Sequence, residues 1–166
     1  MKNIFLIGMM GSGKTTIGKI LSKELSMPLL DMDEEIEKIL DIKITKFFEE
    51  YGENRFRLIE SAFFKECAKN NHFIYATGGG IILDPENCHI LKNCGQTLFL
   101  DCSVKTIISR LNDEKEHRPL LNNDIDIENI YDNRKQLYLD SSHYVINTTL
   151  LSLSESVKKI ITYINK

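Results

Sequence analysis

The sequence predicts an α/β protein of three layers, in which helices cover both faces of a five-stranded parallel sheet. Two observations favour this fold. Short apolar segments rich in strand-forming residues recur five times, and helix-patterned segments separate them. The first apolar segment also runs directly into a glycine-rich turn, GMMGSGKTT at residues 8–16, which opens a helix. Short strands that alternate with helices are typical of parallel sheets covered on both faces.

Local patterns predict each element in order. A first strand, Asn3–Ile7, precedes the glycine-rich turn, and apolar residues at 17, 20, 21 and 25 give helical spacing after it. Asp84 and Pro85 are typical of an N-cap and a first helical residue. The other strands are expected at 28–33, 73–76, 97–100 and 144–146. Further helices are expected at 34–40, 44–70 (broken near Gly52), 104–111, 127–139 and 154–164.

Length and composition indicate one soluble globular domain over residues 1–166, with 42% hydrophobic and 27% charged residues. The formal net charge of −3 argues against a general nucleic-acid binder, which usually carries a basic excess. No apolar run approaches the roughly 20 residues that span a bilayer. A strand expected to start within three residues of the N-terminus leaves no room for a signal peptide. We therefore expect a cytoplasmic protein without a membrane or nucleic-acid partner.

The cysteines and histidines do not predict a metal site. No C-x-x-C pair occurs, and no two histidines have metal-ligand spacing. We expect the histidines to be structural or on the surface, and the cysteines to be reduced, buried thiols. The four cysteines are Cys67, Cys88, Cys94 and Cys102.

The turn at residues 8–16 matches G-x-x-x-x-G-K-[ST] in the strand-to-helix context of a phosphate loop. Glycines let the backbone wrap around a phosphate chain with its N–H groups pointing inward, and the helix adds the positive end of its dipole. Lys14 can reach the β- and γ-phosphates and serve catalysis, while the Thr15 hydroxyl can bind Mg²⁺. A plain glycine turn is the alternative. The predicted nucleotide-binding residues of this loop are Gly11, Ser12, Gly13, Lys14, Thr15 and Thr16.

Other motifs separate this chain from GTPases and ABC-type ATPases, because N-K-x-D, D-x-x-G and L-S-G-G-Q are all absent. The third strand ends in Thr77, where many phosphate-loop enzymes place a metal-holding aspartate, so we expect Asp31 to serve the Mg²⁺ site through water. Asp31 and Asp33 are two apart on a segment expected to be extended, which puts both side chains on one face. A second carboxylate facing an acceptor hydroxyl suits phosphoryl transfer. Alternatively, Asp33 caps the next helix.

Five segments after the phosphate loop carry a resemblance: DMDEEIE (31–37), FRLIE (56–60), ATGGG (76–80), HRPLL (117–121) and RKQLY (134–138). Their order and spacing resemble the shikimate kinase family over nearly the whole chain. The resemblance implies transfer of the ATP γ-phosphoryl group to the 3-hydroxyl of shikimate, with Mg²⁺. It also implies the phosphate-loop fold of nucleoside-monophosphate kinases, with an acceptor-binding region at about 31–61 and a lid at about 112–124.

The resemblance implies roles for residues outside the phosphate loop. Asp33 would hold the shikimate hydroxyls and act as the base for the attacking one. Arg57 and Arg134 would grip the carboxylate, and Arg118 in the lid would reach the ATP phosphates as a further catalytic residue. Arg110 would lie near the adenine. Phe48 and Phe56 would wall the ring of shikimate, and Gly79 would donate its backbone N–H to the substrate. Gly78 and Gly80 are also implied at the shikimate site.

Simpler interpretations remain open for several of these residues. Arg57 and Glu60 lie i,i+3 on a helix, where Glu60 can hold the guanidinium or the two can form a surface ion pair. Arg134 can be an exposed residue of a polar helix, and residues 112–126 a merely flexible loop. The three glycines from Gly78 can form a plain turn, although such a run suits backbone that approaches a ligand closely.

Two positions depart from the family pattern. Asp41 stands where the family usually has glycine, and residues 148–150 lack an arginine that some members place near adenine. We expect a monomer. The alternatives are a kinase for another hydroxy acid, such as gluconate, and a nucleotide-binding regulatory subunit without an acceptor. Adenylate kinase is disfavoured because its Gly-Tyr/Phe-Pro-Arg element is missing.

Overall fold

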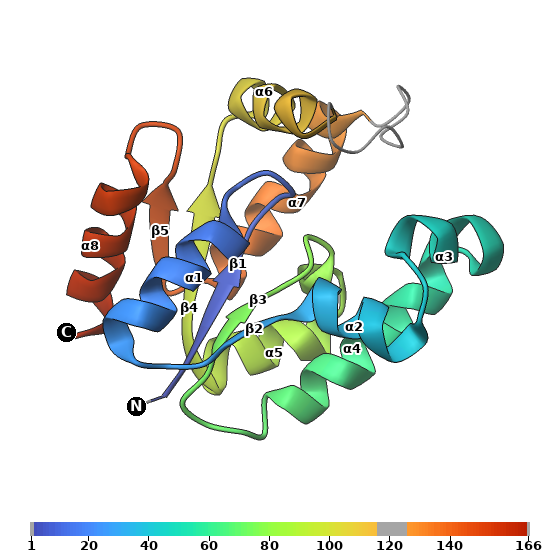
Figure 1. Cartoon of the computed structure of the whole chain (residues 1–166), viewed down its shortest axis with the longest axis horizontal. Helices are drawn as coiled ribbons and strands as arrows, with labels where there is room; N and C mark the ends of the chain where they lie inside the picture. Colours follow the sequence, from blue (N-terminus) through green and yellow to red (C-terminus); the bar gives the residue numbers. More distant parts are fainter. Residues whose placement is uncertain (1, 116–125, 166) are drawn as a thin grey trace.

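The computed structural model describes residues 2–115 and 126–165 and contains the expected five-stranded sheet. All neighbouring strands are parallel, in the order β2-β3-β1-β4-β5 (Figure 1). Because β1 lies at the centre of the sheet, the turn that follows it lies in the middle of the sheet's carboxyl edge. The strands are β1 Asn3–Ile7, β2 Leu29–Asp31, β3 Ile74–Ala76, β4 Gly95–Asp101 and β5 Tyr144–Asn147.

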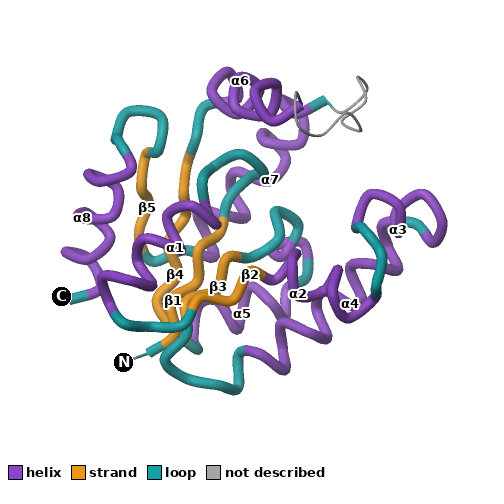
Figure 2. Tube along the Cα trace, in the orientation of Figure 1, coloured by secondary structure: helices purple, strands orange, loops and turns teal. Residues whose placement is uncertain are grey.

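Helices connect successive strands and cover the sheet on both sides, as the tube in Figure 2 shows. The expected break at Gly52 separates α3 from α4, and Asp84 caps α5 by accepting a hydrogen bond from the Glu86 N–H. A short 3₁₀ turn, η1, was not expected from the sequence. The described helical elements are α1 Lys14–Leu25, α2 Met32–Leu40, α3 Ile44–Tyr51, α4 Glu53–Cys67, η1 Ile81–Leu83, α5 Pro85–Asn93, α6 Val104–Lys115, α7 Ile127–Ser141 and α8 Leu153–Ile164.

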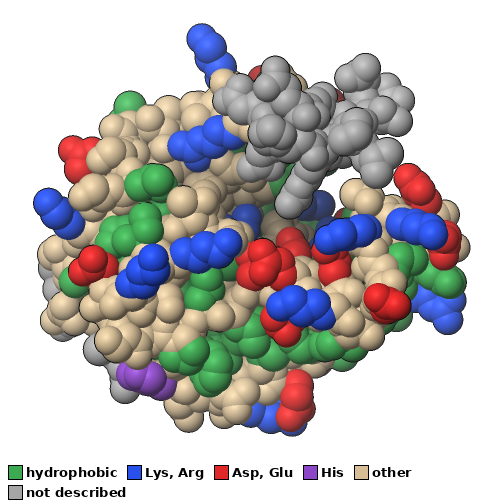
Figure 3. Space-filling model, viewed as in Figure 1, with side chains coloured by type: hydrophobic (Ala, Val, Ile, Leu, Met, Phe, Trp, Pro, Cys, Tyr) green, Lys and Arg blue, Asp and Glu red, His purple; other side chains and the backbone are tan. Residues whose placement is uncertain are grey.

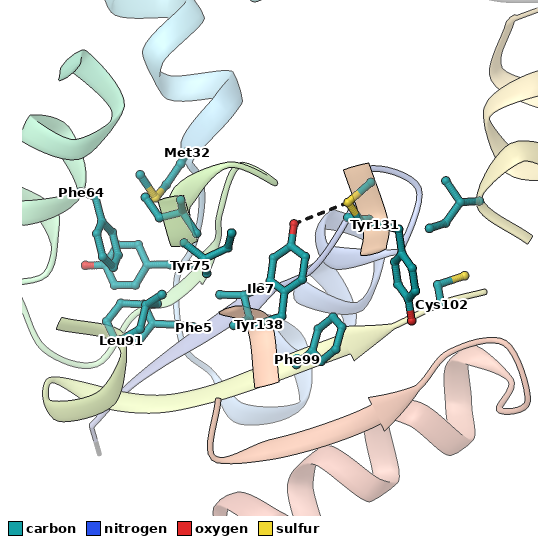
Figure 4. Close-up of a cluster of buried hydrophobic side chains, with 14 of the residues drawn as sticks. Phe5, Ile7, Met32, Phe64, Tyr75, Leu91, Phe99, Cys102, Tyr131 and Tyr138 are labelled. Carbon is teal, nitrogen blue, oxygen red and sulfur yellow. Dashed lines mark hydrogen bonds between the residues drawn. The ribbon is translucent and has the colours of Figure 1, made fainter. Parts of the chain in front are cut away.

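The core has one cluster on each face of the sheet, because successive strand residues point to opposite faces. In β1, Ile4 and Leu6 pack with buried residues of α1 and α8. Phe5 and Ile7 pack on the other face with residues of α4, α5, α6 and α7 (Figure 4). Every residue of β1 is buried, as expected for the central strand of a covered parallel sheet.

The parallel register brings the segments after β1, β2 and β3 to one edge of the sheet. Leu6 pairs with Ala76, and Asp31 pairs with the same Ala76 on its other side. Ligands of open α/β sheets bind beyond this carboxyl edge. The phosphate loop, the two aspartates and the glycine run therefore meet there.

The prediction that Asp33 extends a strand was wrong. β2 ends at Asp31, and Met32 already belongs to α2. The alternative interpretation, in which Asp33 caps the helix, was also wrong, because the Asp31 side chain accepts the hydrogen bond from the Glu34 N–H. Asp31 ends the strand by capping the next helix, so Asp33 lies in the first helical turn.

The departure at Asp41 has a local explanation. Asp41 ends α2 with φ 52° and ψ 34°, a left-handed conformation in which glycine costs least and aspartate is tolerated.

Two further expectations need correction. All four cysteines are free, but only Cys67 and Cys102 are buried, while Cys94 is exposed. The helix expected at 104–111 is longer than predicted, because α6 continues to Lys115, so its end lies in the segment predicted as a lid at about 112–124. The rest of that segment, Arg118 included, lies outside the described residues, so its predicted role stays a prediction. Within the described ranges, no helix has the length and apolar character to cross a membrane.

Candidate active site

The phosphate loop has the backbone form that its glycines allow. Gly13 caps α1 with φ 95°, a left-handed value that disfavours residues with a Cβ, and Gly11 has φ 71°. Between them, Ser12 is fully buried, and its Oγ has no hydrogen-bond partner among the described residues. Thr16, also predicted to bind nucleotide, is exposed at the start of α1.

Lys14 folds back over this loop. Its Nζ donates hydrogen bonds to the Gly8 carbonyl at 2.9 Å and to the Met9 carbonyl at 2.8 Å. Burial lowers the pKa of Lys14 to about 8, and the nearby carboxylates of Asp33 and Asp31 oppose this shift. The loop therefore holds its cation over its own backbone, at the place where phosphate oxygens would bind.

Thr15 and Asp31, the two residues predicted to serve a Mg²⁺ site, lie side by side. The Thr15 hydroxyl donates to Asp31 Oδ2 at 2.5 Å, which pairs a hydroxyl and a carboxylate from adjacent elements. Oxygen ligands of this kind suit Mg²⁺, which usually takes one or two protein ligands together with phosphate oxygens and water. Within residues 2–115 and 126–165, no group of three or more His, Cys, Asp or Glu is placed to hold a metal. A Mg²⁺ ion here would take most of its ligands from the nucleotide and water.

The glycine run at residues 78–80, hereafter the glycine turn, leaves room for side chains from two helices, α2 and α4. A Cβ at Gly78 would overlap Glu60 Oε1 and lie 2.9 Å from Asp33 Oδ1. A Cβ at Gly80 would overlap the Arg57 guanidinium. The missing Cβ atoms thus let Asp33, Arg57 and Glu60 come together against the turn.

Arg57 is held by two carboxylates. Its Nη1 donates to Glu60 Oε2 at 2.6 Å, and its Nε and Nη2 donate to Glu53 Oε1 at 3.0 and 2.6 Å. The Glu60 side chain is only 2% exposed, whereas that of Glu53 is 48% exposed. The interpretation of Arg57 and Glu60 as a surface pair was therefore wrong. Burial raises the pKa of the Glu60 carboxyl, although Arg57 opposes the shift.

Asp33 lies between the phosphate loop and this arginine. Burial raises the pKa of its carboxyl above the ordinary aspartate value, Lys14 and Arg57 oppose the shift, and Asp31 adds to it. Charged side chains of both signs are common on the α2–α4 side of the molecule (Figure 3). A carboxylate with a raised pKa in such a setting is a candidate proton acceptor.

The two predicted aromatic residues lie against Arg57. Phe48 and Phe56 have ring centroids 5.1 Å apart, and the Arg57 guanidinium carbon is 5.8 and 5.4 Å from them. Phe56 is 1% exposed and belongs to the small core of the α2–α4 region. In this conformation the buried Phe56 ring packs against Phe48 and lies near Arg57. Phe48 is partly exposed and therefore offers the accessible ring.

Residues from α7 reach the other side of the glycine turn. Arg134 Nη1 donates to the Gly79 carbonyl at 3.3 Å, and the Tyr138 hydroxyl donates to the same oxygen at 2.5 Å. The position of a Cβ on Gly79 would be 3.6 Å from both the Gly8 carbonyl oxygen and the Met10 amide nitrogen. The glycine turn therefore lies next to the phosphate loop as well. No role was predicted for Tyr138 from the sequence, although its i,i+4 spacing from Arg134 places the two side chains on one face of the helix.

Arg110 links the phosphate loop to the residue that follows β5 through two hydrogen bonds. Its Nη1 donates to the Gly11 carbonyl at 2.9 Å, and its Nη2 donates to the Thr148 carbonyl at 3.0 Å. The side chain thus lies where the nucleotide loop and the 148–150 segment meet. Its predicted contact with adenine stays a prediction.

Together these contacts define a class of protein. A phosphate loop on a five-stranded parallel sheet faces a cluster of two arginines and two carboxylates, which is the arrangement of a phosphate-loop kinase with the nucleoside-monophosphate-kinase-like fold. A family model described as shikimate kinase matches residues 10–165. The chain belongs to the shikimate kinase family, and it is accordingly a nucleotide-binding transferase.

Individual relatives agree with this result. The chain is 38% identical to a shikimate kinase of Caldicellulosiruptor bescii, over 98% of this chain and 95% of the relative. It is 37% identical to a shikimate kinase of Enterococcus faecalis, over 97% of each. A solved structure of shikimate kinase from Acinetobacter baumannii in complex with shikimate has a TM-score of 0.90 and 32% identity, covering 99% of this chain and 93% of that one.

Proposed function

We propose that this chain transfers the γ-phosphoryl group of ATP to the 3-hydroxyl of shikimate, with the residue roles given below. One observation carries the assignment of roles. The phosphate loop and the cluster of Asp33, Arg57 and Arg134 meet at the glycine turn. Gly79 in this turn accepts a hydrogen bond from Arg134 and lies next to the loop. A donor phosphate on the loop and an acceptor in the cluster would therefore lie next to each other, as phosphoryl transfer requires.

The donor side carries Lys14, Thr15 and Asp31. Lys14 would leave the loop carbonyls and donate to the β- and γ-phosphates, stabilising the charge that develops there. Thr15 would bind Mg²⁺ directly and Asp31 through water, consistent with their contact. The bound ion would neutralise phosphate charge. Gly11, Ser12, Gly13 and Thr16 would line the nucleotide, with Arg110 and Arg118 as further contacts.

The acceptor side carries Asp33, Arg57 and Arg134. Asp33 would accept the proton of the attacking hydroxyl, which its raised pKa supports. Arg57 and Arg134 both reach the glycine turn and would bind one carboxylate, since guanidinium groups match that planar group. Phe48 would contact the ring, with Phe56 behind it, and the glycine turn would donate backbone N–H groups. We further propose a cytoplasmic monomer.

An acceptor analogue without the carboxylate tests this reading. Buried donors left unpaired typically cost about 2–5 kcal/mol, or roughly 30- to several-thousand-fold. We expect the wild type to use the methyl ester of shikimate with a much lower kcat/KM than the acid. Arg134→Ala should lower kcat/KM for the acid far more than it weakens ATP binding, and Arg134→Lys should restore only part of the loss.

The control is Lys135→Ala, which removes an exposed cation next to Arg134 on the same helix. Its kcat/KM for the acid should match that of the wild type. Equal use of acid and ester by the wild type would mean that the arginines do not read a carboxylate, and the shikimate assignment would fail with them.

The glycine turn gives a second test. Gly80→Ala places a Cβ where the Arg57 guanidinium lies, so Arg57 must move. Losing a hydrogen bond to a charged partner is worth about 1.5–3 kcal/mol, so we expect KM for shikimate to rise about 10- to 100-fold. In a double-mutant cycle, Gly80→Ala should add little to Arg57→Ala. Additive effects of the two substitutions would show that Gly80 does not act through Arg57.

A further inference from the structure

We propose that Tyr138 is a positioning residue for shikimate binding, whose hydroxyl fixes the orientation of the glycine turn. The inference rests on the proposed function, which places shikimate beside that turn. Tyr138 itself lies on the far side of the turn, on α7, and would not contact the acceptor.

The contacts of Tyr138 place its hydroxyl at a junction. The ring is fully buried and stacks on Phe99 with centroids 4.9 Å apart. The hydroxyl donates to the Gly79 carbonyl at 2.5 Å and lies 3.7 Å from Met9 Sδ in the phosphate loop. One buried hydroxyl thus touches both the glycine turn and the phosphate loop.

Holding a carbonyl also sets the direction of an N–H group. In a trans peptide unit the C=O and N–H bonds point in opposite directions, and the described chain has no cis peptide. Because the Gly79 carbonyl points to α7, the Gly80 N–H of the same unit points away from α7. The preceding carbonyl, of Gly78, is held in the same way by the Ile81 N–H at 3.3 Å. The two peptide units of the turn are therefore both fixed through their oxygens.

Arg134 contacts the glycine turn at the same atom as Tyr138. It donates to the same Gly79 oxygen, but at the longer distance of 3.3 Å. The Tyr138 hydroxyl, at 2.5 Å from the Gly79 oxygen, therefore holds the turn whichever of its donors Arg134 gives to a substrate carboxylate. Burial raises the pKa of Tyr138 to about 12, so the hydroxyl stays a neutral donor in the physiological range.

Tyr138→Phe tests the proposal because phenylalanine keeps the ring and its stacking on Phe99. A lost neutral hydrogen bond corresponds to about a 3- to 10-fold change, and we expect KM for shikimate to rise by that factor. KM for ATP should stay at the wild-type value. This split separates positioning of the acceptor from a general loss of structure.

Tyr131→Phe is the matched control. Tyr131 lies on the same helix, is also buried, and loses a hydroxyl bond to Asp101 Oδ1 of 2.7 Å that does not involve the glycine turn. We expect it to lower the melting temperature at least as much as Tyr138→Phe, because its lost partner is a carboxylate, and to leave KM for shikimate unchanged.

Three results would overturn the proposal: an unchanged KM for shikimate in Tyr138→Phe, an equal rise of both KM values, or a variant that does not fold. The last would show that the hydroxyl serves the fold. The proposed function fails by a different measurement, the comparison of acid and ester with the wild type, so the two failures are distinguishable.

Discussion

Lys14→Ala is expected to lower kcat by at least about 100-fold with the fold intact, because it removes a preorganised positive charge from the transferred phosphoryl group. In the structure, Nζ is bonded to two loop carbonyls, and no carboxylate pairs directly with it among the described contacts. Truncation therefore breaks no ion pair, although the buried Asp33 carboxylate loses a nearby positive charge. The backbone of the loop, set by its glycines, should persist.

The measurement is kcat with saturating ATP and shikimate, together with a thermal melt of each protein. Lys19→Ala is the control, since Lys19 lies exposed on the same helix and should keep wild-type activity. A folded Lys14→Ala protein with more than about a tenth of the wild-type rate would show that the phosphate site has been misplaced.

Asp33→Asn is expected to abolish most of the activity, by about 100- to 10,000-fold in kcat, while ATP binding persists. Asparagine keeps the size of the side chain but cannot accept the proton of the attacking hydroxyl. The structure makes this test cleaner than the sequence alone could, because Asp31 and not Asp33 caps α2. The substitution therefore leaves the helix start unchanged.

Activity and ATP binding are measured on one preparation of Asp33→Asn. Glu34→Gln serves as the control, because it removes an exposed charge from the same helical turn. A variant that keeps most of the wild-type kcat would mean that Asp33 is not the base. Burial raises the pKa of Asp33, so its base form is lost at a higher pH on acidification than for an exposed aspartate. The acid limb of wild-type kcat/KM should therefore lie above the ordinary aspartate pKa.

The elements predicted from the sequence were those with a local cause. The phosphate loop joins a strand and a helix that are contiguous with it in the chain. The residues of this one segment were therefore enough to predict the strand, the loop and the helix. The break at Gly52 and the cap at Asp84 likewise depend on a few neighbouring residues only. Asp33 was misplaced because Asp31 can end a strand and also start a helix, and the pattern does not say which residue ends the strand.

The sequence by itself therefore determined the fold class, the strand-to-helix form of the phosphate loop and the family. The tertiary structure decided how the cluster of Asp33, Arg57 and Arg134 at the glycine turn is built. Gly78 and Gly80 lack Cβ atoms to make room for Glu60 and Arg57, which come from a helix that ends before β3 begins. Tyr138 gains its role from a carbonyl 59 positions away in the chain. Such contacts depend on how helices pack against the sheet, and packing over long sequence separations leaves no periodic trace in the chain.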